Sequence, residues 1–152
     1  MCAMKRLLAS MGAAVLLAGG AAAVNAHQAA SSEPDRQRAR AVAAAVTAPP
    51  GATVSDDCNG PGIVGCWTSS QPVPRLAEEM SERLALAAGA PVTTTCDEVP
   101  VSTTGTPRSS DSCFVRVRYE AHGVFIFLDP LVERNEGGGA TVAGSRVVVQ
   151  AA

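Results

Sequence analysis

The clearest alternation of hydrophobic and polar positions lies in residues 113–129, CFVRVRYEAHGVFIFLD. Apolar residues take every second place in residues 115–119, which is the period-two pattern of a half-buried strand, and residues 124–128 form a second run rich in β-branched and aromatic side chains. Between the runs, His122 and Gly123 suit a two-residue turn with positive φ at both positions. The sequence therefore predicts a β-hairpin that turns at His122 and Gly123.

This turn predicts a register in which Tyr119 faces Ile126 and Arg116 faces Asp129. One face of the hairpin is then wholly apolar, and it consists of Val115, Val117, Tyr119, Val124, Ile126 and Leu128. The opposite face mixes charges with rings, and its candidate binding residues are Phe114, Arg116, Arg118, Phe125 and Phe127.

Three explanations are open for aromatic rings on a face that usually turns polar residues to solvent. In the first, Arg118 lies over Phe127, Arg116 pairs with Asp129, and the N-terminal helix or a loop covers the rest. In the second, the rings form a small second core. In the third, they form a partner-binding patch, because aromatic residues and arginine are enriched at interfaces.

Helical periodicity predicts two helices. The stronger runs from Pro74 to Ala88, is followed by Gly89, and has an apolar stripe that should pack on the apolar face of the hairpin. The other begins near Ser32 and runs to about Thr47. Its stripe of alanine and valine is thin, so we expect it to attach weakly.

Further strands are predicted at residues 63–69, 92–99 and 146–149, with a flexible glycine-rich loop over residues 133–145. The fold class is α+β: a small antiparallel sheet of four or five strands, with one helix packed on one face. The expected organisation is a signal peptide over 1–26, an N-terminal helix and linker over 27–50, and a single domain over 51–152.

The chain begins like a secretory signal peptide, with Lys5-Arg6 before an apolar, alanine-rich run. Small residues at Val24 and Ala26 favour cleavage before His27; a cut before Val24 is the second choice. We therefore expect secretion. The alternative is an uncleaved N-terminal membrane anchor.

Cysteine usage agrees with export. Cys2 lies in the signal region, and the other cysteines form an even set in a small domain: Cys58, Cys66, Cys96 and Cys113. Three pairings are possible, and we favour Cys58 with Cys66 and Cys96 with Cys113, because each bridge would close an irregular loop. A zinc site is the alternative, but no C-x-x-C motif is present.

Charge and motifs restrict the function. The chain has 12 basic and 14 acidic residues and no long basic run, which argues against nucleic-acid binding. It has no G-x-S-x-G or H-E-x-x-H motif, and the glycines at 137–139 are not followed by the lysine of a phosphate loop. Copper chelation by His27 with His122 is conceivable chemically, but we expect no metal and no cofactor.

The sequence therefore predicts a small secreted, non-catalytic domain that binds an unknown protein or cell-envelope partner. It would meet a membrane only through an uncleaved signal segment. The alternative is a secreted enzyme or enzyme inhibitor that presents a disulfide-bordered loop, either residues 56–65 or residues 100–112.

Overall fold

A computed structural model describes residues 32–97, 99–100, 111–134, 136 and 138–152. The predicted signal peptide and His27 lie outside the described residues. The chain divides into two units, residues 1–34 and residues 35–152, and the architecture below belongs to the second.

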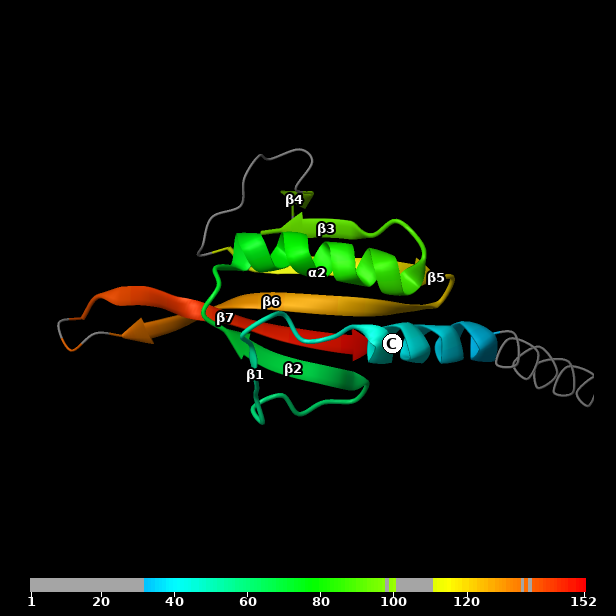
Figure 1. Cartoon of the computed structure of the whole chain (residues 1–152), viewed down its shortest axis with the longest axis horizontal. Helices are drawn as coiled ribbons and strands as arrows, with labels where there is room; N and C mark the ends of the chain where they lie inside the picture. Colours follow the sequence, from blue (N-terminus) through cyan, green and yellow to red (C-terminus); the bar gives the residue numbers. More distant parts are fainter. Residues whose placement is uncertain (1–31, 98, 101–110, 135, 137) are drawn as a thin grey trace, which may run out of the picture. The chain divides into compact units, whose positions relative to one another are not determined.

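Seven strands of the described chain form one antiparallel sheet in the order β1-β2-β7-β6-β5-β3-β4 (Figure 1). The strands are β1 (Thr53–Val54), β2 (Ile63–Ser69), β3 (Thr93–Cys96), β4 (Val99–Pro100), β5 (Cys113–Tyr119), β6 (His122–Arg134) and β7 (Ala140–Ala151). The α+β class agrees with the sequence prediction. The sheet is larger than predicted because short strands, β1 and β4, extend it at both edges.

The central hairpin turns two residues earlier than predicted. Val115 pairs with Ile126 and Tyr119 pairs with His122, so Glu120 and Ala121 form the turn, with Glu120 at φ 50°. Gly123 lies in β6 and has a different role: a Cβ there would come within 2.5 Å of the carbonyl oxygen of Val117. The glycine permits a close approach of two backbones, and the predicted register is wrong.

The assignment of faces survives this change. Moving a turn by two residues re-pairs the strands but leaves each side chain on the same side of the sheet. Every member of the predicted apolar face is buried: Val115, Val117, Tyr119, Val124, Ile126 and Leu128. We call this side the inner face; Val147 and Val149 of β7 complete it.

The helix α2 (Val73–Ala88) contacts β5 and β6. Its stripe of Leu76, Met80 and Leu84 is fully buried and belongs to the same hydrophobic cluster as the inner face. Gly89 ends the helix in the left-handed conformation at φ 60°, which glycine adopts without steric cost.

An N-terminal helix covers residues 32–45, and its part from residue 35 onward belongs to the same unit as the sheet. The predicted stripe is buried in the common core: Ala39, Val42, Ala43 and Val46. The Arg38 guanidinium lies 4.5 Å from the centre of the Tyr119 ring, so this helix covers the inner face too. It does not cover the opposite face, which was one of the predicted possibilities.

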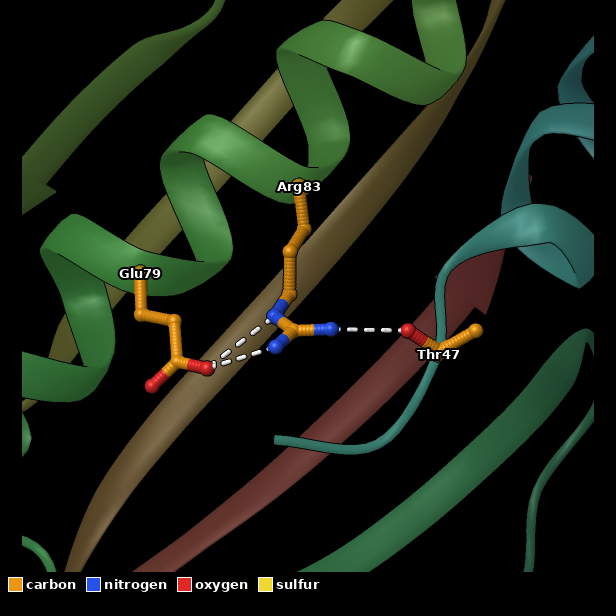
Figure 2. A network of polar contacts seen from close by, with 3 residues as sticks. All are labelled: Thr47, Glu79 and Arg83. Atoms are coloured by element: carbon orange, nitrogen blue, oxygen red, sulfur yellow. Dashed lines mark hydrogen bonds and ion pairs between the residues drawn. The ribbon is translucent and has the colours of Figure 1, made fainter. Parts of the chain in front are cut away.

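A polar contact connects the two helical segments (Figure 2). Arg83 of α2 donates to Glu79 Oε1 from Nε at 3.1 Å and from Nη2 at 2.7 Å, and its Nη1 donates to Thr47 Oγ1 at 2.8 Å. The same arginine therefore joins α2 to the segment that follows the N-terminal helix.

Strands β6 and β7 continue as a two-stranded arm beyond their neighbours (Figure 1). The predicted flexible loop over 133–145 is in part paired strand: Val132 faces Val142 and Arg134 faces Ala140, after a register shift at Leu131. Threonine and valine at 141 and 142 favour an extended backbone, and this outweighs the flexibility that neighbouring glycines give.

Both predicted disulfides are present. Cys58–Cys66 connects the loop before β2 to that strand, and Cys96–Cys113 connects paired positions of β3 and β5. Disulfides form and persist in oxidising surroundings, so the structure suits an extracytoplasmic setting.

Candidate binding face

The side of the sheet opposite the helices, which we call the outer face, carries the residues that the sequence singled out. Phe114 lies directly across from Phe127, and Arg116 lies across from Phe125. On neighbouring β7, Val148 pairs with Phe127 and Gln150 pairs with Phe125. Alternation along β5 and β6 therefore brings the three phenylalanines together on one surface.

The three rings form a cluster centred on Phe114. Its ring centre lies 5.7 Å from that of Phe125 in a stacked arrangement, and 5.0 Å from that of Phe127 in a tilted one. Both distances are within the range of favourable aromatic contacts. Phe114 and Phe125 are half-buried, whereas Phe127 is 37% exposed. The cluster thus presents an aromatic edge to solvent.

The arginines do not lie where the predicted register put them. The Arg116 guanidinium is 6.0 Å from the centre of the Phe114 ring, at the outer limit of a cation–π contact. Arg118 is exposed and faces Gly123 instead of Phe127. The predicted pairs Arg118–Phe127 and Arg116–Asp129 are wrong because the true turn shifts each partner along β6.

A chain of polar contacts borders the cluster at its other end. The Ser112 amide donates to Asp97 Oδ1 at 3.3 Å, and the Ser112 hydroxyl hydrogen-bonds Asp129 Oδ1 at 3.0 Å. Arg146 Nη2 then donates to Asp129 Oδ2 at 3.4 Å. Sequence reasoning missed this chain, because the true partner of Asp129 is on β7 and follows only from the observed register.

Part of the ring cluster and part of the polar chain line an open depression of about 740 Å³. Phe114, Arg116 and Phe127 form its aromatic and cationic side, and Asp97, Ser112 and Asp129 form its acidic side. Such a surface offers apolar contact, a cation and hydrogen-bond acceptors within one patch. These features are typical of surfaces that recognise another protein.

In the part of the chain that the structure describes, no three His, Cys, Asp or Glu side chains are grouped so that they could hold a metal ion. Among the described helices, none is both long enough and apolar enough to cross a bilayer. Comparison with protein-family models, with curated proteins and with solved structures finds no match to this chain.

Proposed function

We propose that this protein is a small secreted, non-catalytic binding domain that captures a protein or cell-envelope partner with the outer face of its sheet. The observation that carries the proposal is the exposed ring of Phe127 in a cluster with Phe114 and Phe125. A sheet with one face under helices normally turns polar residues outward. An aromatic cluster beside arginine has the composition of an interface core.

The surroundings of the cluster support recognition of another protein. Arg116 on one side and Asp129 on the other would form a polar rim around the rings. The formal net charge of −2 gives no electrostatic support for nucleic acid as the partner. The Cys96–Cys113 bridge keeps β3 and β5 connected beside this face, which limits the ordering cost of binding.

The experiment removes the exposed ring of Phe127 and leaves the inner core intact. The mature domain is immobilised and exposed to native culture fluid and detergent-released cell-surface proteins; a captured partner is then purified and its Kd measured. Phe127→Ser should weaken the Kd by about tenfold or more, as expected for a central aromatic anchor. Leu86→Ser is the matched control, because Leu86 is an 87% exposed leucine on α2.

The melting temperature separates binding from packing. The proposal expects that the melting temperature of Phe127→Ser stays within about 2 °C of the parent while partner binding falls. A melting temperature lowered by several degrees for the double substitution of Phe125 and Phe127 by Ser, with partner binding retained, would show that the rings form a second small core.

A second candidate is enzyme inhibition by a rigid loop. Residues 57–61 are mostly exposed and adjoin the Cys58–Cys66 bridge, which holds their loop against β2. Of the other candidate loop, 100–112, most residues lie outside the described part. Titration of a panel of secreted proteases with the domain tests this function, and inhibition that Phe127→Ser leaves unchanged would favour it over the outer face.

A further inference from the structure

A second hollow lies where the N-terminal helix approaches the ends of three strands. Its walls are Arg36, Arg40 and Ala44 of the helix, residues 61–64 at the start of β2, His122 of β6, and residues 150–152 at the end of β7. We call this hollow the basic groove. Its volume of about 650 Å³ is in the range of small-molecule sites.

The spacing of residues along the N-terminal helix explains which side chains form the helical wall of the groove. Arg36, Arg40 and Ala44 are four residues apart and therefore share one face of the helix. The adjacent stripe of the helix, which includes Ala39 and Ala43, is buried in the core and fixes the helix in place. Arg36 has an interaction of its own within the chain as well. The exposed side chain of Arg40 extends the positive charge along the same wall.

Backbone and side-chain hydrogen bonds hold the sheet wall of the groove together. Ala151 N donates to Gly62 O at 2.8 Å, Gln150 Nε2 donates to Pro61 O at 3.0 Å, and Gly123 N donates to Ala152 O at 2.8 Å. A Cβ at Gly62 would overlap the carbonyl oxygen of Ala151, so only glycine allows this approach.

The Cys58–Cys66 bridge constrains the loop that carries Gly62. The sheet wall is therefore preformed, which lowers the cost of binding a ligand.

The lining of the basic groove combines apolar side chains with positively charged ones. Ala44, Ile63, Val64 and Ala151 make it largely apolar, its charged side chains are the two arginines, and no Asp or Glu lines it among the described residues. Guanidinium groups pair with carboxylates and phosphates through two parallel hydrogen bonds. An apolar floor beneath such a cationic wall fits a ligand with an anionic head and an apolar tail.

We propose that the basic groove binds an anionic amphiphile, with a carboxylate or phosphate head against Arg36 and Arg40 and an apolar tail over Ile63 and Ala151. This site is distinct from the depression beside Phe114 and Phe127, since the two share no lining residue. Its test is therefore independent of the test of the proposed partner binding.

Amide chemical shifts of the ¹⁵N-labelled domain, titrated with decanoate below its micellar concentration, test the site. The largest shifts should come from Gly62, Gly123 and Ala151, with saturable binding. Decyl phosphate should reproduce them if the head can be either anion. Decanol and decyltrimethylammonium, which have the same tail without an anionic head, should bind at least about tenfold more weakly.

The variant Arg36→Gln/Arg40→Gln should weaken decanoate binding by about tenfold or more. The matched control is Arg75→Gln/Arg134→Gln, which removes the same charge from two exposed sites away from the groove and should bind like the parent. Equal affinity of both double variants would overturn the proposal. Inorganic phosphate that binds as tightly as decyl phosphate would overturn the role of the apolar floor.

A steric test does not depend on the arginines. Ala44→Trp places a large ring in the groove at an exposed helix position and should abolish decanoate binding. Ala41→Trp, at another exposed position of the same helix that does not line the groove, should preserve it. If Ala44→Trp binds decanoate as the parent does, or if decanoate shifts outer-face amides instead, the groove is not the site.

Discussion

The two faces of this sheet are made by the same strands, yet successive residues on β6 have opposite surroundings. Ile126 is fully buried beneath the helices, and Phe127 beside it is 37% exposed on the outer face. On the inner face, aliphatic side chains from strands and helices fill a shared core. On the outer face, the rings of Phe125 and Phe127 both contact the ring of Phe114. Alternation along the strands therefore decides which side chains lie in the core under the helices. The side chains on the other face stay accessible to the proposed partner.

Truncating a core side chain on the inner face should give the largest effect on stability. Leu84 is fully buried, so Leu84→Ala should lower the free energy of unfolding by about 2–5 kcal/mol through lost transfer energy and a cavity. Leu86 on the same helix is 87% exposed, and Leu86→Ala should change it by about 0.5 kcal/mol or less. Urea unfolding measures both. Similar values for the two variants would mean that α2 does not cover the inner face.

A substitution in the N-terminal helix should have a smaller effect on the stability of the same core. Val42 is 8% exposed, and Val42→Ala removes two methyl groups from the core, at a cost of about 1–2 kcal/mol in unfolding free energy. Val54→Ala is the control, because Val54 is 77% exposed. A Val42→Ala cost no larger than that of Val54→Ala would establish the weak attachment that the thin apolar stripe predicts.

The turn that sets the register of both faces offers a stabilising change. Glu120 has φ 50°, a conformation that is strained for residues with a Cβ, so Glu120→Gly should raise the free energy of unfolding by about 0.5–1 kcal/mol. His122→Gly, within β6, should lower it because glycine weakens a strand. The reverse result, in which Glu120→Gly lowers the free energy of unfolding and His122→Gly raises it, would instead support the predicted turn at His122 and Gly123. Thermal unfolding decides between them.

The smallest effect belongs to the ion pair on the outer face. Arg146 and Asp129 are 3.4 Å apart, and each side chain is 41% exposed. A double-mutant cycle with Arg146→Gln and Asp129→Asn should give a coupling of about 0.5 kcal/mol or less, since water screens exposed pairs. A coupling above about 1.5 kcal/mol would show that the outer face is less open to water than its exposure indicates.

The periodicity of the sequence predicted those elements that depend on a local pattern. The span of β2 and the end of α2 at Gly89 were found, since apolar alternation and a glycine stop are local signals. The hairpin faces were right but its register was wrong. A glycine needed for close backbone approach and a glycine needed for a turn look the same in sequence, and a shift of the turn by two residues preserves the sorting of faces.

The candidate sites likewise include features that the sequence could predict and features that it could not. The ring cluster could be predicted because Phe114, Phe125 and Phe127 share a face in either register. The polar chain through Ser112 and Asp129 could not, since it depends on which residues actually pair. The basic groove draws on four segments that are far apart in the chain, and no periodicity along one segment signals such a meeting.

The order of the disulfides has a consequence for biosynthesis. Among the described cysteines, each is bonded to its immediate neighbour in sequence: Cys58 to Cys66, then Cys96 to Cys113. A chain that enters an oxidising compartment N-terminus first would present each pair in turn, before the next pair arrives. Stepwise oxidation would then give the native connectivity without reshuffling by a disulfide isomerase, and the first bridge would close before α2 has emerged.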